Sequence, residues 1–402
     1  MTRAFALLIA VGLISAGCSG EKGAAAPTPA TESSSAPATP SEQTPSEQAP
    51  SDRTPTIRSS TFVDGLEIPW DIAFLPDGSM LYTERDRERV THRKTDGSSE
   101  VVLDEPSGVW HNGETGLEAI EPAADFATSN DFITCHGYQK GNTQDVRVVR
   151  WHLDGDKASF VRNLVTGLPS TSGRHGGCAL EHGADKSLYV GTGDAADGRN
   201  PRNLNSGGGK VLRVDDKTGK GLPDNPFADS GNTMRQRVWS FGHRNIQGLA
   251  LRESDDSMWS VEHGPDRDDE VNRTVKGGDF GWHPVPGFNE SVPMTDQSLP
   301  GKQYDAAWNT GRQTLATSGG TFLRGDGWGK WEGGLAVASL KDESLHVLLF
   351  DDAGKLTDDI DVKALHGKYG RLRATAVGPD GSLYLTTSNG DDEIVKVTPS
   401  AG

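Results

Sequence analysis

The chain has 402 residues, with 40 lysines and arginines against 57 aspartates and glutamates, so its formal net charge is −17. Such an acidic chain is not expected to bind nucleic acid, because that binding relies on clustered Lys and Arg side chains. Its 50 glycines and a hydrophobic fraction of only 34% favour a turn-rich β protein over a helical bundle.

The N-terminus resembles an export signal that ends at a lipidation site. Arg3 supplies a positive charge, residues 4–14 are apolar, and small residues at 15–17 lead into Cys18. This order resembles a bacterial lipobox, in which the cysteine thiol receives a diacylglycerol. We therefore predict that residues 1–17 are removed and that Cys18 anchors the protein to the outer face of the bacterial cell membrane. An ordinary cleaved signal with an incidental cysteine is the alternative.

Residues 19–56 consist mainly of Ala, Pro, Ser, Thr, Glu and Gln. A segment with so few large apolar side chains cannot offset the entropy lost on folding. We therefore predict a disordered tether over residues 19–56 and a folded domain over residues 57–402.

The folded part repeats a strand–turn–strand pattern. The clearest copies are Ile72–Arg85, Ala179–Gly193, Leu249–His263 and Thr375–Ser388, and weaker copies are Leu117–His152 and Gly320–Phe350. Alternating apolar residues bury one face of each strand, and Asp-Gly pairs suit tight hairpins. Six units of roughly 58 residues, each close to four strands, predict an all-β, six-bladed β-propeller whose loops meet in a central funnel. A two-domain β-sandwich protein is the rival, but the repeats continue to the C-terminus without a linker.

Polar motifs are densest in residues 240–282. Arg244 and Asn245 precede an expected strand, and Gly264-Pro265 is followed by acidic residues at 266 and 268–270. Loops rich in Gly and Pro offer carboxylates and carbonyls to hard cations such as calcium. In a chain of this charge, a solvated acidic turn is an equal alternative.

The same stretch carries the motifs GHRN-x-QGLA, E-x-GP-x-x-DDE-x-N and GG-x-x-GW. Together they resemble the soluble quinoprotein aldose dehydrogenases of the glucose/sorbosone dehydrogenase family, and IPWDIAFLPDG and GKVLRV followed by LPDNPF extend the resemblance over nearly the whole folded part. Members are six-bladed propellers that bind pyrroloquinoline quinone (PQQ) and calcium. The resemblance implies oxidation of the anomeric carbon of an aldose to the lactone, with hydride passing to the quinone. The chain has no C-x-x-C-H haem motif, so electrons are expected to leave to a separate acceptor.

The resemblance assigns the chemical step to His175 and Arg244. His175, in GRHGGCAL, falls at the family's base, where a neutral imidazole takes the proton of the anomeric hydroxyl. A purely structural histidine is the alternative. Arg244 and Asn245 match the family pair at the quinone, where a guanidinium stabilises the charge that develops on the C5 oxygen.

Cofactor contacts follow from the same resemblance. Lys341, Arg371 and Arg373 match the cations that pair with the three carboxylates of PQQ, although surface solvation would explain each of them alone. Glu114 stands where a cofactor-contacting Gln is expected, and a carboxylate there would repel the cofactor unless it is protonated or paired. Arg174 stands where some members have Asp, and we expect it to neutralise Glu114 or to supply positive charge.

Two calcium sites are also implied by the resemblance. Gly264 and Pro265 match positions whose backbone carbonyls hold the cofactor's calcium, which polarises the quinone oxygen. Glu270 and the carbonyl of Phe280 match a second, structural site.

Three further residues have two readings each. Trp308 could line the sugar site, because aromatic faces suit sugar rings, or could belong to the core. Cys135 and Cys178 lie in neighbouring expected blades, and outside the cytoplasm they could form a disulfide or remain free thiols.

The sequence therefore predicts a PQQ- and calcium-dependent aldose dehydrogenase outside the cytoplasm, attached to the membrane by its lipid alone. The alternative is a non-catalytic propeller lipoprotein that binds a ligand or partner through the funnel, and Glu114 motivates it. A lactonase-type propeller hydrolase is a third reading, but it would need carboxylate and Asn ligands converging on a metal.

Overall fold

The computed structural model describes residues 53–400. The predicted signal segment 1–17, Cys18 and residues 19–52 of the predicted tether lie outside the described residues. Residues 53–400 form 24 strands that pair into six separate four-stranded sheets, so the expected six-bladed β-propeller is confirmed.

Five blades each take four consecutive strands, paired antiparallel in chain order. The first has β2 (Pro69–Phe74), β3 (Met80–Glu84), β4 (Arg89–Arg93) and β5 (Ser99–Asp104). The second has β6 (Leu117–Pro122), β7 (Asp131–Lys140), β8 (Thr143–Asp154) and β9 (Lys157–Leu168). The third has β10 (Gly177–His182), β11 (Leu188–Thr192), β12 (Lys210–Val214) and β13 (Val238–Phe241). The fourth has β14 (Ile246–Arg252), β15 (Ser257–Glu262), β16 (Glu270–Arg273) and β17 (Trp308–Asn309). The fifth has β18 (Thr317–Phe322), β19 (Leu335–Ser339), β20 (Leu345–Phe350) and β21 (Leu356–Asp361).

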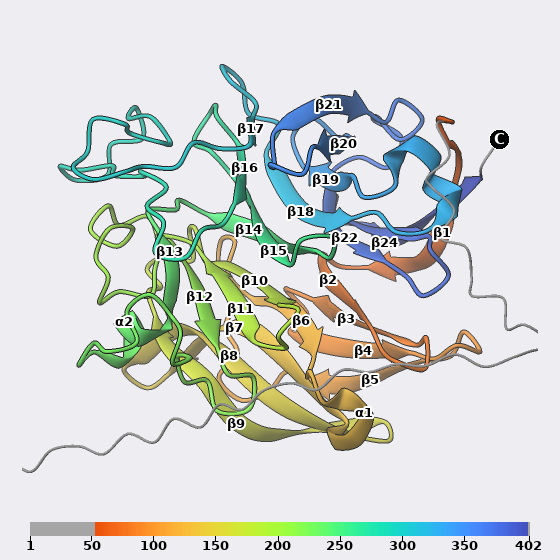
Figure 1. Cartoon of the computed structure of the whole chain (residues 1–402). Helices are drawn as coiled ribbons and strands as arrows, with labels where there is room; N and C mark the ends of the chain where they lie inside the picture. Colours follow the sequence, from red (N-terminus) through yellow and green to blue (C-terminus); the bar gives the residue numbers. More distant parts are fainter. Residues whose placement is uncertain (1–52, 401–402) are drawn as a thin grey trace, which may run out of the picture. The chain divides into compact units, whose positions relative to one another are not determined.

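The sixth blade joins the two ends of the domain. It contains β22 (Leu372–Val377), β23 (Leu383–Thr387) and β24 (Asp392–Ser400), and its outer strand is β1 (Thr56–Leu66), which pairs antiparallel with β24. Figure 1 shows the red β1 beside the blue β24. Because β1 supplies an outer strand from the start of the domain, the ring is closed by main-chain hydrogen bonds between its two ends.

The remaining helical elements are short. They are α1 (Phe126–Ser129), α2 (Thr233–Arg237) and the 3-10 helix η1 (Asp326–Trp331). No helix among residues 53–400 has the length and apolar character needed to cross a membrane.

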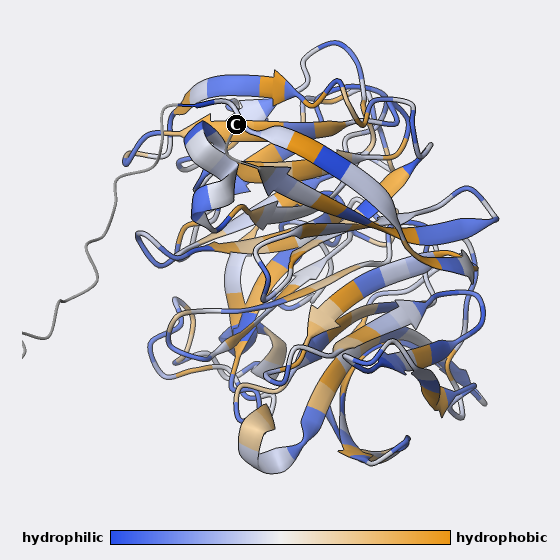
Figure 2. Cartoon of the chain, turned by 90° about the vertical axis from the view of Figure 1, so that its right-hand side faces the viewer, coloured by the Kyte–Doolittle hydropathy of each residue, from blue (hydrophilic) through white to orange (hydrophobic). Residues whose placement is uncertain are grey.

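The first strands of the six blades, β2, β6, β10, β14, β18 and β22, contact one another around the ring. Apolar side chains fill the spaces between blades; for example, Leu81 and Val90 of the first blade pack with Leu117 and Phe132 of the second. Figure 2 shows hydrophobic residues along the strands and hydrophilic residues concentrated in the loops. This pattern follows from the period-two alternation, which turns every second side chain towards a neighbouring sheet.

The six repeated sequence segments correspond to the inner strands of the six blades. The Asp-Gly turns behave as predicted: Gly78 has φ 85°, Gly381 has φ 74°, and Asp77 Oδ1 accepts a hydrogen bond from the amide of Ser79 at 2.9 Å. A positive φ is easy only for glycine, so these turns hold the two inner strands in register.

A disulfide joins Cys135 of β7 to Cys178 of β10, with 5.8 Å between their Cα atoms. It therefore links the second blade to the third. The sequence left open whether these cysteines are bonded or free, and the structure has them bonded.

Candidate functional site

The predicted site residues gather where the first strands of the blades begin, which we call the entry end of the propeller. Glu114 precedes β6, His175 precedes β10, Arg244 and Asn245 precede β14, and Arg371 precedes β22. Loops from different blades meet here: the amide of Glu114 donates to the carbonyl of Gly173 at 3.0 Å, beside the His175 loop. Because each first strand enters the ring in the same direction, residues far apart in the chain come together at this end.

His175 is buried and is held by a carboxylate. Its Nδ1 lies 2.8 Å from Oδ1 of the fully buried Asp194, and Oδ2 of Asp194 accepts a hydrogen bond from the indole of Trp282 at 2.7 Å. Since a carboxylate only accepts, Nδ1 of His175 carries the hydrogen. Nε2 is then the ring atom that can take a proton, which is the arrangement required of a general base.

Glycines around His175 allow the close packing that positions it. His175 itself has a left-handed backbone, with φ 53°, and its carbonyl lies against Gly193, where a Cβ atom would come within 2.1 Å of it. A Cβ on Gly176 would lie 2.3 Å from Thr115 Oγ1, and one on Gly177 would lie 2.0 Å from the amide nitrogen of Gly193. The Gly-Gly pair after His175 is therefore a steric requirement of the loop that presents the histidine.

Arg244 lies beside this dyad. Its carbonyl accepts from the amide of Asp194 at 2.8 Å, and its Nη1 donates to the carbonyl of His263 at 2.6 Å. Its Nη2 donates to Glu290 Oε1 at 2.6 Å, whereas its buried Nε has no hydrogen-bond partner within residues 53–400. The structure thus brings His175 and Arg244 together, as predicted, and leaves the Nε donor of the guanidinium unpaired within residues 53–400.

A group of arginines lies next to Asn245 and Glu114. Arg373 is buried, with its guanidinium 3.7 Å from the ring centroid of Trp70, and Arg85 lies 5.3 Å from the same ring. Burial and the neighbouring Arg85 lower the pKa of Arg373 to about 9. A guanidinium at this position is stabilised by an anion, so the group suits an acidic ligand.

Arg371 and Lys341 extend this positive region outward. Arg371 Nη1 donates to the carbonyl of Leu340 at 3.4 Å, which places it beside the backbone at Lys341. Both side chains are exposed. The three predicted cofactor cations thus come from the loop after β19 and from the start of β22, and Arg85, which pairs with Asp86, lies beside them.

Glu114 and Arg174 do not pair, contrary to one of the two expectations for Arg174. Glu114 Oε2 accepts from Asn245 Nδ2 at 2.9 Å, whereas Arg174 Nη2 pairs with Glu290 at 2.6 Å. The reason is that Glu290 lies between Arg174 and Arg244. Glu114 is instead near Arg373, whose charge it favours.

The residues predicted to hold the cofactor's calcium, Gly264 and Pro265, would do so through their backbone carbonyls. The carbonyl of Gly264 is 2.5 Å from Nδ1 of His263 and keeps a second lone pair, and the amide of Gly264 donates to Asp269. Pro265 is partly exposed. Within residues 53–400, no three His, Cys, Asp or Glu side chains cluster as metal ligands.

Glu270, predicted for the second calcium site, offers a buried carboxylate. Its buried carboxylate accepts from two neutral groups, Asn272 Nδ2 and Thr295 Oγ1, each at 3.2 Å. Burial and the nearby Glu262 raise the pKa of Glu270 to about 8. Phe280, its predicted companion, is buried with its ring stacked on His243 at 4.6 Å.

The substrate assignment of Trp308 is corrected by its position. Trp308 begins β17, the outermost strand of its blade, and packs in the core with Trp259 and Leu335. Its indole donates to Asp359 at 2.9 Å. Trp308 is therefore a core residue, which was the equal alternative in the sequence analysis.

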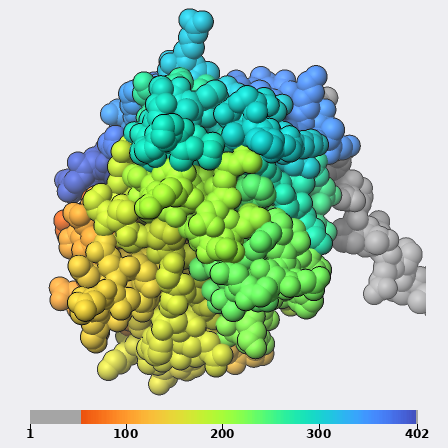
Figure 3. All heavy atoms as spheres, turned by 90° about the vertical axis from the view of Figure 1, so that its left-hand side faces the viewer, coloured from red at the N-terminus to blue at the C-terminus, as the bar shows by residue number. Residues whose placement is uncertain are grey.

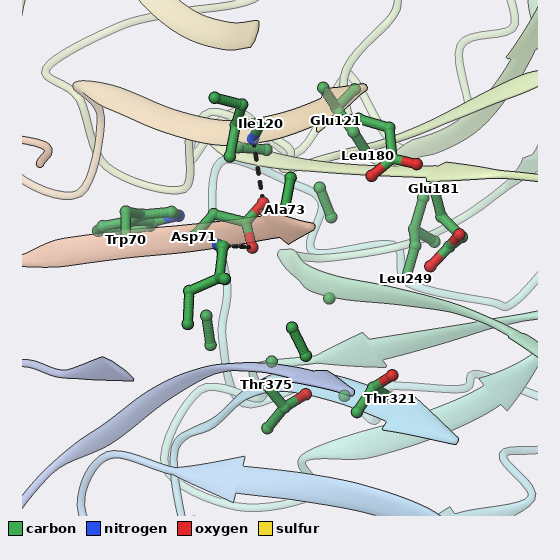
Figure 4. Close-up of a pocket in the computed structure, with 18 of the residues that line it drawn as sticks. Trp70, Asp71, Ala73, Ile120, Glu121, Leu180, Glu181, Leu249, Thr321 and Thr375 are labelled. Carbon is green, nitrogen blue, oxygen red and sulfur yellow. Dashed lines mark hydrogen bonds between the residues drawn. The ribbon is translucent and has the colours of Figure 1, made fainter. Parts of the chain in front are cut away.

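A central cavity of about 260 Å³ runs along the first strands, from Trp70, Gln247 and Arg373 to Glu121 and Glu181. Figure 4 shows Asp71 in its wall, bonded to the amides of Ile72 and Ile120. Burial raises the pKa of Asp71 to about 7, and burial together with Glu121 raises that of Glu181 to about 8. The cavity thus has Arg373 towards one end and, farther along, the carboxyl groups of Glu121 and Glu181 together with Arg324.

Several residues of the site were missed from the sequence. They are Asp194, Trp282, Arg85, Trp70, Phe288 and Glu290. Asp194 had a local signal, because it ends the GTGD segment that follows an expected strand. Trp282 ends the GG-x-x-GW motif and Trp70 lies in IPWDIAFLPDG, but neither motif shows what its tryptophan contacts. Glu290 and its partner Arg244 lie 46 residues apart in sequence, and Trp70 meets Arg373 across the closed ring.

Comparisons with known proteins agree with this geometry. The family model described as Glucose / Sorbosone dehydrogenase matches residues 66–396. The chain is 29% identical over 347 residues to the aldose sugar dehydrogenase YliI of Escherichia coli, which covers 84% of this chain and 91% of that protein. It is also similar to the PQQ-bound aldose sugar dehydrogenase of Streptomyces coelicolor (TM-score 0.73, 28% identity, 88% of this chain and 100% of that chain). The apo-form of the soluble aldose sugar dehydrogenase of Escherichia coli matches with a TM-score of 0.75 and 28% identity, over 86% of this chain and 100% of that chain.

Proposed function

Because this chain belongs to the glucose/sorbosone dehydrogenase family, we propose that it is a PQQ-dependent enzyme that oxidises the anomeric carbon of an aldose to the lactone. The observation that carries the proposal is the convergence of a carboxylate-held histidine, a buried arginine and a group of further cations at one end of the propeller. His175, Arg244 and Arg373 come from three different blades, and their chemistry is that of a base beside a site for an anionic ligand.

The protein's own groups supply the proton chemistry and the orientation. Nε2 of His175 takes the proton of the anomeric hydroxyl, and Asp194 keeps Nδ1 protonated and stabilises the imidazolium that results. Bound PQQ would accept the hydride that leaves the anomeric carbon. Arg244, buried and held by the His263 carbonyl and Glu290, offers its free Nε to negative charge at that position.

The cations would hold the carboxylates of the cofactor. Arg373 has a buried Nε without a hydrogen-bond partner in the described chain, and Arg85, Arg371 and Lys341 lie around it. Arginine can engage carboxylates bidentately, so several of them around one ligand give both affinity and orientation. Asn245 holds Glu114 by a hydrogen bond, and the arginines nearby offset its charge.

The test is reconstitution of the full chain with PQQ and calcium chloride, followed by dye reduction with a panel of aldoses. The wild type is expected to reduce the dye and to form the lactone. His175→Ala should lose activity by a factor of about 10² to 10⁴ while PQQ still binds. His152→Ala is the matched control, because His152 also pairs with an aspartate but lies on the outer part of β8. A protein that binds no PQQ at high micromolar concentration would favour the non-catalytic lipoprotein instead.

We also propose that Glu270 binds calcium. A buried carboxylate with neutral donors alone gains from a hard cation, and the carbonyl of Phe280 would be a further oxygen ligand. Calcium should therefore raise the melting temperature of the wild type but not that of Glu270→Gln. An equal rise in both proteins would place the ion elsewhere.

The proposal extends to location. A lipid on Cys18 would hold the domain outside the cytoplasm, where the Cys135–Cys178 disulfide is stable. The wild type should partition into detergent after expression in a bacterium, and Cys18→Ser should remain in the aqueous phase. Aqueous partitioning of both proteins would refute the anchor.

A further inference from the structure

One long connector, residues 274–307, leaves the third strand of the fourth blade and returns as β17. Within it, the ring of Phe288 lies 5.8 Å from the ring of His175 and 6.3 Å from Trp282, measured between centroids. Figure 3 shows the teal connector beside the yellow-green segment around residues 170–200 on one face of the molecule. The connector therefore covers the loop that presents the predicted base.

Glu290 lies two residues after Phe288 and joins a buried cation to an exposed one. Its Oε1 accepts from Arg244 Nη2 and its Oε2 from Arg174 Nη2, both at 2.6 Å. The Glu290 side chain is 29% exposed and that of Arg174 is 46% exposed, whereas that of Arg244 is 3% exposed. Each carboxylate oxygen can accept a second hydrogen bond, so Glu290 keeps acceptor capacity on its solvent side.

The connector is fixed in place at several points. A Cβ atom on Gly198 would come within 2.7 Å of the carbonyl of Gly287 and 2.9 Å of that of Pro284. Arg267 Nη2 donates to the carbonyls of Ser291 and Val292 at 2.8 and 3.1 Å. Phe288 and Glu290 are therefore presented by a supported segment, which a recognition surface requires.

We propose that Phe288 and Glu290 form the wall that recognises the aldose, a role that rests on the proposed dehydrogenase function. The face of Phe288 would pack on the apolar C–H face of the sugar ring. Glu290, held by Arg174 and Arg244, would accept hydrogen bonds from sugar hydroxyls, and a fixed carboxylate discriminates strongly between a sugar and its deoxy analogue. The aromatic role predicted for Trp308 thus passes to Phe288.

The experiment uses the full chain reconstituted with PQQ and calcium chloride and compares Phe288→Ala and Glu290→Gln with the wild type. Phe160→Ala and Glu253→Gln are matched controls, since Phe160 is an exposed aromatic residue on β9 and Glu253 is an exposed partner of an arginine. Steady-state rates are measured with aldoses and their monodeoxy analogues. PQQ affinity is measured by absorbance titration without sugar, and folding by thermal melting.

Phe288→Ala should raise KM about tenfold, with little change in kcat and unchanged PQQ affinity. Glu290→Gln should reduce the preference for one aldose over its deoxy analogue by about tenfold, while the controls behave as wild type. An active wild type whose KM and sugar preference are unmoved by both substitutions would overturn this inference alone. A uniform loss of kcat in Glu290→Gln, with preference intact, would also overturn it, because Glu290 would then serve only to hold Arg244. A wild type that binds PQQ but oxidises no aldose would overturn the proposed function and this inference together.

Discussion

Replacing Asp194 by asparagine tests whether His175 acts as a base. Asp194 is fully buried and accepts three hydrogen bonds: from His175 Nδ1, from the amide of Ala196 at 2.7 Å and from the Trp282 indole. Asparagine has a single acceptor oxygen. In one orientation its amide faces the Trp282 N–H, so two donors meet. In the other it faces both donors to Oδ1, His175 Nδ1 and the amide of Ala196. Nδ1 must then accept, which moves the hydrogen to Nε2 and removes the base, and the Ala196 amide is left without an acceptor.

The two orientations set the expected size of the effect. An unsatisfied buried donor costs about 1–3 kcal/mol of stability. Loss of the basic nitrogen removes a general-base contribution of about 10² to 10⁴ in rate, which corresponds to about 3–5 kcal/mol in the activation free energy. One orientation removes the base, and the other keeps the tautomer but removes the negative charge that stabilises the imidazolium. We therefore expect kcat to fall at least about 100-fold, with a modest loss of stability.

The assay measures kcat of the reconstituted enzyme, PQQ affinity and the midpoint of urea unfolding. Asp131→Asn is the control, because Asp131 also accepts from a histidine, His152, and from Arg150, but on β7 away from the entry end. Asp131→Asn should lose stability without loss of kcat. An Asp194→Asn enzyme whose kcat stays within about threefold of the wild type would refute the role of His175 as a base held in one tautomer.

Three other predictions concern the scaffold. Gly177→Ala should lower the free energy of unfolding by more than about 3 kcal/mol, because its Cβ would meet a backbone nitrogen at 2.0 Å. Gly141→Ala, with a similar φ but no atom within 4 Å, should lower it by about 1 kcal/mol. Equal losses in urea titrations would contradict the steric argument. Between pH 3.8 and about 7, Asp71 keeps its proton in the native state but releases it in the unfolded chain. The free energy of unfolding should therefore fall by up to about 4 kcal/mol as pH rises through this window, and Asp71→Asn should remove that fall. Parallel pH profiles of wild type and variant would refute this prediction. Replacing Cys135 and Cys178 together by alanine should lower stability by about 4 kcal/mol for a separation of 43 residues, and an unchanged melting temperature would refute this.

The sequence predicts the fold because each blade carries its own local signal. Two strands and a polar turn recur six times, and the Asp-Gly pairs that end at Gly78 and Gly381 indicate the turn geometry from the local sequence alone. The pairing of β1 with β24 has no such signal, because it joins residues more than 300 positions apart. The pairing of neighbouring strands within a blade can thus be predicted from local sequence, whereas the pairing that closes the ring cannot.

The site is predictable only in part, for the same physical reason. His175 and Arg244 lie in motifs whose neighbours are also their structural supports. The partners that complete their chemistry come from elsewhere: Trp282 reaches Asp194 across 88 residues, and Glu290 reaches Arg174 across 116. A tryptophan's sequence context also does not distinguish a core position from a ligand-facing one, which is why the sugar role of Trp308 was wrong.

The pairing of β1 with β24 has a consequence for how the protein is made. β1, which begins the domain, can pair only when β24, which ends it, has been synthesised. The last blade therefore cannot assemble until nearly all of the polypeptide has left the ribosome. Until then the cradle for the ligand lacks one of its six walls. Binding of the proposed cofactor would accordingly be a late event, which requires the finished chain.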